Sequence, residues 1–412
     1  MPYPTEAPLL KLTSTPMRNW TDPCPDTTAW DWVYTLQPAY MAVICVLGAV
    51  GNAFVVSVLC LQRKRRASVA EVYLCNLAVA DLVLVSCLPF WAVTVAHEFH
   101  WHFGTLMCKL VNVAISANYF CSVLSLMLVS IDRYLALARP LTFGRLRGGP
   151  GRARRLCLAI WVASLVLSLP TLLFRKVKRI PELDMDACVL DFPHNAWRIQ
   201  RNVTSNVVGF LVPVTVLAFC TCQVVTSLRQ RWNQSRGTRL GVGQEVWPGM
   251  EKKRKATRLV MVVFVAFLLC WLPHQLLRFL DTLDQLQVLT GCTWGYILDI
   301  GTQMSTYLAY MNSALNPFLY VLMGKNFRSK AKEVFQNVLS NRGERSKSSY
   351  TVHLTSTVQH MQSTKHGAGL LNSGSLVLPS LCDPACLLSL VLGFLELGLG
   401  FLGIGFVWLG RL

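Results

Sequence analysis

The first long apolar stretch of the chain reads LQPAYMAVICVLGAVGNAFVVSVLCLQRKRR at residues 36–66. No charged residue precedes Arg63 in this stretch, and about 20 apolar residues in a helix suffice to cross the hydrocarbon core of a bilayer. The four cations from Arg63 to Arg66 follow directly, and clusters of Lys and Arg next to a span remain on the cytoplasmic side. The stretch therefore predicts a transmembrane helix with its N-terminal end outside the cell.

The same pattern recurs along the chain. Six further apolar stretches lie at residues 69–95, 108–137, 156–174, 203–228, 256–283 and 297–323. The 412 residues are 53% hydrophobic and 15% charged, whereas soluble proteins have about 25% charged residues. A soluble core does not need seven spans of this length. We therefore predict an all-α membrane protein whose core, residues 35–323, is a bundle of seven transmembrane helices.

The remaining segments flank this core. Residues 1–34 are predicted to form an extracellular N-terminus, with a glycosylation sequon at Asn19. Residues 324–340 read as a short amphipathic eighth helix, and residues 341–369 as a Ser/Thr-rich cytoplasmic tail. Residues 370–412 form an apolar extension. Its stretch 387–409 is open to three interpretations: an eighth span, an interfacial segment, or a gene model that reads past the normal end.

The net charge of +18 does not indicate nucleic-acid binding, because the cations gather in the predicted inner loops. The third inner loop alone has nine Lys or Arg from Arg229 to Arg258. This distribution is a topology signal and favours contact with anionic membrane lipids. We expect a multi-pass protein of the plasma membrane with an extracellular N-terminus.

Four of the 15 cysteines fall on the outer side in this topology: Cys24, Cys108, Cys188 and Cys292. An even number in the oxidising compartment favours two disulfides over free thiols. Three pairings are open on this argument.

An ionisable residue inside a span is costly and is a candidate functional residue. Asp81 lies in the second span, while Asn118 and Ser122 lie one turn apart on the third, as Asn312 and Asn316 do on the seventh. Such a ring of oxygens suits a small hard cation such as Na⁺ or a proton-linked switch. The alternative is a carboxyl group that is buried simply as a hydrogen-bonding centre.

The third span ends in Asp132-Arg133-Tyr134. An Asp–Arg pair at the end of a helix can be an ordinary surface ion pair, which contributes little. An arginine at this position can also exchange its neighbour for a partner on another helix or protein, as a two-state switch requires.

Prolines interrupt three predicted spans, at Pro213, Pro273 and Pro317. Each removes a hydrogen bond within the helix and creates a kink or hinge. Trp271 lies beside the sixth-helix hinge. Its ring is either core packing or a means of converting ligand contact into helix rotation.

These motifs together resemble the fingerprint of the rhodopsin-like G-protein-coupled receptors over roughly residues 30–340. The matching residues are Gly51-Asn52, Leu77-Ala78-Val79-Ala80-Asp81, Asp132-Arg133-Tyr134, Trp161, Cys270-Trp271-Leu272-Pro273 and Asn316-Pro317-Phe318-Leu319-Tyr320. Each is weak alone, but their order, one set per helix, is specific. The resemblance implies that Asp132, Arg133, Tyr134 and Tyr320 act in G-protein coupling.

Further segments resemble the bradykinin (kinin) receptors: Leu88-Pro89-Phe90-Trp91-Ala92, residues 128–137 (LVSIDRYLAL), Asn206-Val207-Val208-Gly209-Phe210 and Phe279-Leu280-Asp281-Thr282-Leu283. This resemblance implies disulfides Cys108–Cys188 and Cys24–Cys292. It also implies coupling to Gq-family G proteins, with phospholipase C and calcium signalling. A receptor kinase and arrestin are further implied partners, through phosphorylation of the tail at Ser346, Ser348, Ser349, Thr355, Ser356 and Thr357.

The ligand positions follow from the same resemblance, because kinins are short basic peptides with arginine at or near both ends. Asp281 and Asp299 match acidic positions that receive the N-terminal arginine, and Arg175 matches a basic residue near the peptide carboxylate. Rim charges are otherwise usually just solvated. Ser116 stands where the subtype that prefers peptides lacking the last arginine has a lysine, so the chain resembles the type-2 receptor for intact kinin. Deeper contacts above Trp271 are implied for Trp91, Asn118, Gln275, Gln303 and Tyr310, although several could serve only in packing.

Two positions depart from the pattern of the family. Lys253 stands where relatives often have an acid at the start of the sixth helix, so it cannot latch Arg133, and we expect raised basal signalling. His274 replaces an aromatic residue beside the hinge, and a neutral, hydrogen-bonded histidine is the favoured interpretation.

Other functions fit the sequence less well. A transporter would show internal repeats with broken helices in matching positions, and the sequence has none. The nearest alternative is a peptide receptor of the angiotensin or chemokine type. No metal cluster, activated nucleophile or phosphate loop supports an enzyme, and no resident cofactor is expected apart from the Na⁺ already considered.

Overall fold

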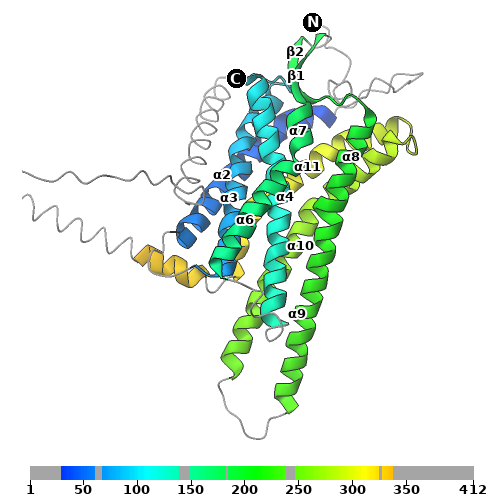
Figure 1. Cartoon of the computed structure of the whole chain (residues 1–412). Coiled ribbons are helices and arrows are strands. Elements are labelled where there is room, and N and C mark those ends of the chain that lie inside the picture. The colour runs from blue at the N-terminus through cyan, green and yellow to red at the C-terminus, as the bar shows by residue number, and fades with distance from the viewer. Residues whose placement is uncertain are drawn as a thin grey trace, which may run out of the picture.

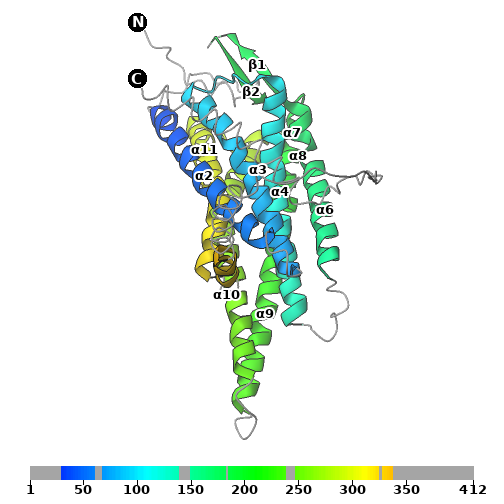
Figure 2. The same ribbon diagram turned by 90° about the vertical axis from the view of Figure 1, so that its left-hand side faces the viewer.

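A computed structural model describes residues 29–60, 67–138, 149–181, 184–237, 246–323 and 327–336; the side chains of residues 29–33, 60, 231–237 and 246–260 are outside the description. Long helices account for most of it, as Figures 1 and 2 show. They are α2 (Ala29–Cys60), α3 (Val69–Ala96), α4 (Gly104–Leu137), α6 (Pro150–Leu167), α7 (Leu169–Phe174), α8 (Asn195–Asn206), η2 (Val207–Leu211), α9 (Val212–Gly237), α10 (Val246–Gln285) and α11 (Cys292–Met323).

The helices form seven rods, since α6 and α7 make up one and α8, η2 and α9 another. Six rods are long and apolar enough to cross a membrane. The seventh, α11, has 32 residues, but polar residues such as Asp299, Gln303 and Asn312 lower its hydropathy. The predicted seven-helix bundle is confirmed, and a further helical segment follows at residues 327–336.

The bundle is apolar on its outer face as well as inside. Leu, Val and Phe side chains on α2, α6 and α10 are left exposed, among them Val50, Val162 and Leu269. Lipid is as apolar as these side chains, so the interior of such a bundle is held by close packing and by hydrogen bonds between helices. Asn52 is an example: it is fully buried and donates to the Ser313 carbonyl of α11 at 2.9 Å.

Several helices extend beyond the predicted apolar stretches. The fifth rod begins at Asn195 rather than 203, and α10 begins at Val246 rather than 256. The added turns are polar or charged, so hydropathy does not detect them. Figures 1 and 2 show α9 and α10 projecting past the rest of the bundle at one end.

Two helices have local breaks that separate their halves. In the fourth rod α6 ends at Leu167, and Pro170 lies in the first turn of α7. In the fifth rod the π-helix η2 precedes Pro213, where a kink was predicted. Proline cannot donate the hydrogen bond that Gly209 would receive in a regular α-helix, so the wider turn is tolerated immediately before it.

The connection after α7 forms a β-hairpin that the sequence analysis did not predict. Strand β1 (Arg175–Ile180) pairs antiparallel with β2 (Met185–Leu190), and Val177 lies opposite Cys188. A disulfide joins Cys188 to Cys108 at the start of α4, as the resemblance implied. The hairpin therefore lies over the end of the bundle opposite the projecting ends of α9 and α10 (Figure 1).

Candidate ligand cavity

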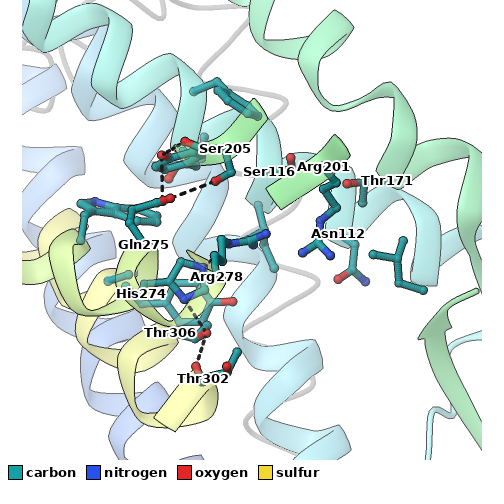
Figure 3. Close-up of a pocket in the computed structure, with 18 of the residues that line it drawn as sticks. Asn112, Ser116, Thr171, Arg201, Ser205, His274, Gln275, Arg278, Thr302 and Thr306 are labelled. Atoms are coloured by element: carbon teal, nitrogen blue, oxygen red, sulfur yellow. Dashed lines mark hydrogen bonds between the residues drawn. The ribbon is translucent and has the colours of Figure 1, made fainter. Parts of the chain in front are cut away.

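A cavity of about 310 Å³ opens beneath the hairpin. Its walls come from α2, α3, α4, α6, α7, α8, α10 and α11, with Phe99 contributed by the loop after α3 and Arg175 and Leu190 by the hairpin. Figure 3 shows polar side chains from several of these helices meeting around it. A concave, partly apolar site with a few polar groups is the usual form of a ligand site.

Seven of the nine predicted ligand residues line this cavity: Trp91, Ser116, Asn118, Arg175, Gln275, Gln303 and Tyr310. They come from five segments that are distant in sequence, and the fold brings them to one space. Asp281 and Asp299 are not among the lining residues. Asp299 is half-buried on α11.

Trp271 lines the cavity and is only 7% exposed. Its ring centroid lies 4.4 Å from that of Tyr119, which in turn packs on Phe120 at 4.9 Å. Gln275 donates to the Tyr119 hydroxyl at 2.9 Å and accepts from Ser205 at 3.3 Å. A ligand that reaches this aromatic stack therefore contacts α4, α10 and the fifth rod together.

Arg175 is positioned by the disulfide-linked strand. Its guanidinium donates to the Cys188 carbonyl at 2.9 Å and lies 5.7 Å from the centre of the Trp91 ring. Burial lowers the pKa of Arg175 to about 10, so the side chain remains a cation at physiological pH. It can pair with a carboxylate through charge-assisted hydrogen bonds.

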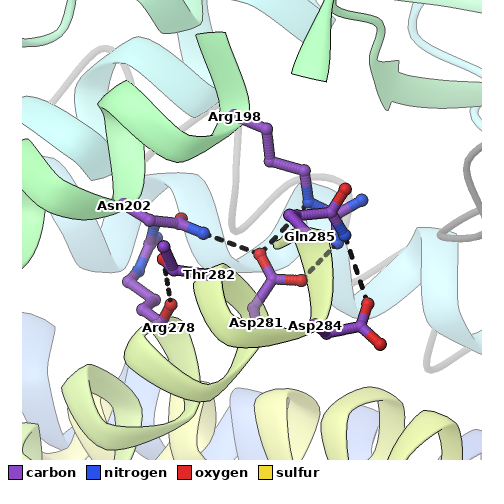
Figure 4. A network of polar contacts seen from close by, with 7 residues as sticks. All are labelled: Arg198, Asn202, Arg278, Asp281, Thr282, Asp284 and Gln285. Carbon is purple, nitrogen blue, oxygen red and sulfur yellow. Dashed lines mark hydrogen bonds and ion pairs between the residues drawn. The ribbon is translucent and has the colours of Figure 1, made fainter. Parts of the chain in front are cut away.

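Asp281 already has partners within the chain (Figure 4). Arg198 of α8 donates to its two carboxylate oxygens, at 2.6 and 3.1 Å, and Asn202 donates at 2.6 Å. Arg198 thus makes the two-pronged contact that a ligand arginine would make with this carboxylate. The position predicted to receive a ligand cation is filled by one from α8.

The sequence analysis missed two arginines that line the cavity, Arg201 on α8 and Arg278 on α10. Arg278 donates from Nε to Nε2 of His274 at 2.8 Å. Because an arginine cannot accept a hydrogen bond, Nε2 of His274 is the acceptor, and its Nδ1–H faces Ser305 and Thr306 at 3.4 Å. This geometry is that of a neutral histidine. Helical spacing could have revealed Arg278 from the sequence. It lies four residues after His274 and three before Asp281, which places all three on one face of the helix.

Asp81 is fully buried in the middle of the bundle. Asn316 donates to one carboxylate oxygen at 2.8 Å and Asn118 to the other at 3.5 Å. Ser122 and Asn312 are also buried, but no bond from either to Asp81 is formed. The hydroxyl of Ser122 has no hydrogen-bond partner among the described residues. The structure therefore brings two of the four predicted side chains into contact with Asp81.

The predicted coupling residues lie toward the other end of the bundle. Nε of Arg133 lies 4.0 Å from the nearest carboxylate oxygen of Asp132, and the centroid of the Tyr134 ring lies 5.8 Å from that of Phe219. Tyr320 is 2% exposed, and its hydroxyl has no partner within the described part of the chain.

Other predicted positions lie outside the description. They are Cys24, Asn19, the phosphorylation positions from Ser346 to Thr357, and residues 370–412. Lys253 lies on α10 where side chains are not described. Cys292 is disulfide-bonded, and Cys24, its predicted partner, lies outside the described residues.

Comparison with known proteins agrees with this architecture. Residues 51–320 match the family described as 7 transmembrane receptor (rhodopsin family). The chain is 43% identical to the B2 bradykinin receptor of Homo sapiens over 325 residues, which are 78% of this chain and 80% of that protein. It is 44% identical to the B2 bradykinin receptor of Mus musculus over 78% of this chain and 79% of that one. Against the B1 bradykinin receptor of Canis lupus familiaris it is 42% identical over 76% and 86%.

Proposed function

The chain belongs to the rhodopsin family of seven-transmembrane receptors and, within it, to the bradykinin receptors, and on that basis we propose that it binds a bradykinin-like peptide in the cavity beneath the hairpin. The carrying observation is the convergence of seven predicted ligand residues on that one cavity. The chain is a receptor and not an enzyme.

The C-terminal half of the peptide enters the cavity in this proposal. Arg175 binds its carboxylate, while Trp91, Gln303 and Tyr310 hold the neighbouring residues. Ser116 is small and accepts from the Ser168 hydroxyl at 3.0 Å, so it leaves room for the last arginine of an intact kinin. This favours the type-2 preference for the full-length peptide.

Activation proceeds through Trp271 and Pro273. Pressure on the aromatic stack favours a rotation of α10 about Pro273, whose missing hydrogen bond weakens the helix at that turn. Arg133 then exchanges Asp132 for the G protein. The peptide shifts this equilibrium only by its differential affinity for the two states.

The finer steps of signalling are part of the same proposal. We infer coupling to Gq-family G proteins with release of calcium, followed by phosphorylation of the tail and arrestin binding. The receptor lies in the plasma membrane with its N-terminus outside, consistent with the cations of the inner loops.

Asp81 is proposed to hold Na⁺ as an allosteric ion. The Ser122 hydroxyl, buried without a partner among the described residues, is an oxygen ligand available to such an ion, and Asn118 and Asn316 hold the carboxylate in place by donating to it. Hard cations prefer such oxygen donors. Bound Na⁺ would balance the charge of Asp81 in the resting bundle.

The proposal is tested by calcium release in transfected cells at matched surface expression. Bradykinin, the same peptide lacking its last arginine, angiotensin and a chemokine are applied in turn. We expect a response to bradykinin, a weaker one to the shortened peptide, and none to the other two. A response to angiotensin or the chemokine in the absence of one to bradykinin would replace the proposed ligand class.

A further inference from the structure

A serine follows the basic run between the first two membrane helices. The chain reads Arg65-Arg66-Ala67-Ser68-Val69, so two arginines stand two and three residues before a hydroxyl group and an apolar residue stands directly after it. Protein kinases of the basophilic class bind two such arginines through acidic side chains and the next residue through an apolar contact. The description of the chain resumes at Ala67. The sequence around Ser68 therefore has the form of a substrate for a kinase of this class.

The Ser68 hydroxyl is accessible to an enzyme of this kind. Its side chain is exposed, and its backbone is extended, with φ −75° and ψ 159°, as kinases require of a bound substrate. The hydrogen bond that its oxygen accepts from the Glu71 backbone N–H is long, at 3.4 Å. Val69 begins α3 and is 8% exposed, so the first turn of the helix has to open. Terminal turns open at little cost in free energy.

Ser68 and Glu71 form a capping box at the start of α3. One oxygen of the Glu71 carboxylate accepts from the Ser68 backbone N–H at 3.0 Å, and the other pairs with Nζ of Lys330 at 2.6 Å. Lys330 belongs to the helical segment 327–336, and both side chains of the pair are only 19% exposed. One acid therefore ties the start of α3 to a segment that is distant in sequence.

We propose that Ser68 is phosphorylated by a basophilic serine/threonine kinase and that its phosphate replaces Glu71 as the partner of Lys330. The Ser68 hydroxyl oxygen bonds to the γ-phosphorus of ATP, the bond from that phosphorus to ADP breaks, and the hydroxyl proton passes to the kinase. The phosphate has a charge of about −1.5 to −2 at pH 7. It repels the Glu71 carboxylate in the same turn, while the N-terminus of α3 and the ammonium of Lys330 attract it.

The inference goes beyond the proposed function and rests on it only for the orientation of the chain. A kinase that uses ATP acts in the cytoplasm, where the cations after the first helix are expected. Access of an antibody to an N-terminal tag on intact cells tests the orientation by itself. The phosphorylation is tested on purified receptor, which exposes both faces, and needs no peptide ligand. Failure of the orientation or of kinin binding is therefore distinguishable from failure of the site.

The first experiment incubates purified receptor with ATP and the catalytic subunit of the cyclic-AMP-dependent kinase, and maps phosphate by mass spectrometry. We expect phosphate at Ser68, and at least tenfold less of it when Arg65 and Arg66 are both replaced by glutamine. Ser68→Asn should have none, because it removes the acceptor while keeping a good N-cap. An unmodified Ser68, or equal modification without the two arginines, would overturn the site.

Ser329→Ala is the matched control for this experiment. Ser329 is exposed and lies between Arg328 and Lys330, but no arginine stands two or three residues before it. Its replacement should leave the amount of phosphate at Ser68 unchanged. A parallel loss at Ser68 would show that the kinase recognises general positive charge in place of the two arginines, against the proposal.

Thermal unfolding tests the exchange of partners. Glu71→Gln keeps an oxygen for the capping box but loses the charge that pairs with Lys330, so it should lower the midpoint of the unmodified receptor by about 2 °C. In receptor phosphorylated at Ser68 the same substitution removes a repelled carboxylate and should leave the midpoint unchanged or raise it. Kinase-treated Ser68→Asn controls for the treatment. An equal decrease in both forms would mean that the phosphate does not displace Glu71.

Discussion

At the scale of single residues, the guanidinium of Arg198 occupies the place that an arginine of the peptide ligand would take. It pairs with Asp281, the carboxylate that we predict to receive the N-terminal arginine of the peptide, so the two arginines would compete. Replacing Arg198 with alanine should raise the affinity for a kinin with an N-terminal arginine about fivefold, the equivalent of about 1 kcal/mol. Competition binding with peptides that have or lack that arginine measures the change.

The control for this substitution is Arg179→Ala, which removes an arginine from the hairpin and should leave both affinities unchanged. The gain should be confined to the peptide with the arginine. A loss of affinity in Arg198→Ala would mean that Arg198 supports the site instead of competing for it.

Asp81 allows a second prediction at the residue scale. Asp81→Asn keeps the size of the side chain but removes the charge that would hold Na⁺. We expect agonist affinity to fall about threefold to tenfold when NaCl replaces an organic cation salt in the unaltered receptor, a range within the usual coupling free energies. The affinity of the variant should be the same in both salts.

Ser122→Ala gives a graded comparison, because it removes one neutral oxygen and should reduce the salt effect only in part. Agonist binding that is insensitive to Na⁺ in the unaltered receptor would contradict the ion site.

The buried carboxylate of Asp81 could be predicted from the sequence, whereas the pairing of Arg198 with Asp281 could not. Asp81 was predictable, because a carboxylate within an apolar span is costly wherever the neighbouring helices lie. The pairing of Asp281 was not, because it depends on the direction of Arg198. That residue lies in the polar first part of the fifth rod, which hydropathy does not identify as helix.

At the scale of elements, the π-helix η2 has little room for an added side chain. A Cβ atom on Gly209 would lie 2.5 Å from the Tyr119 hydroxyl, and Tyr119 is held by Gln275 and packed on Trp271. Gly209→Ala should destabilise the receptor by about 1–3 kcal/mol through overpacking and weaken peptide binding. Thermal unfolding and saturation binding on purified receptor measure the two effects.

Gly151→Ala is the matched control, because it also lies in a helix and nothing lies within 4 Å of its added Cβ. That variant should be neutral or stabilised by up to about 1 kcal/mol, as expected for alanine in place of a helical glycine. Equal behaviour of the two variants would show that the contact between Gly209 and Tyr119 is not a constraint.

Hydropathy predicted the elements only where they cross the membrane. The hairpin escaped prediction because its strands have only six residues each and neither alternates polar and apolar residues: Arg175–Ile180 reads RKVKRI and Met185–Leu190 reads MDACVL. The π-turn escaped because Pro213 indicates a disturbance in the helix but does not specify its form. The break at Ser168 shows the same limit, since Pro170 is compatible with either a kink or a new helix.

At the scale of the whole molecule, α10 is the element that could couple the two ends of the bundle in the proposed activation. The cavity is enclosed by the hairpin at one end, and Arg133 lies toward the other. The helix α10 connects them, with Trp271 and Pro273 between its ends. Because the seven rods follow directly from seven apolar stretches, this long-range arrangement was the most predictable level of the structure, whereas the charges inside the cavity were the least.

The last prediction concerns Lys253 and the equilibrium of the whole receptor between its resting and active states. Relatives often have an acid at this position that can latch Arg133; a lysine cannot form that pair, so we expect the resting state to have one restraint fewer. Lys253→Glu should lower ligand-free inositol phosphate production, by about fivefold if the restored pair contributes about 1 kcal/mol, and should lower agonist affinity in parallel. Lys253→Gln removes the repulsion without adding a partner and should fall between the two. Basal signalling that is the same in all three receptors, at matched surface expression, would mean that the α10 end of the bundle does not restrain Arg133.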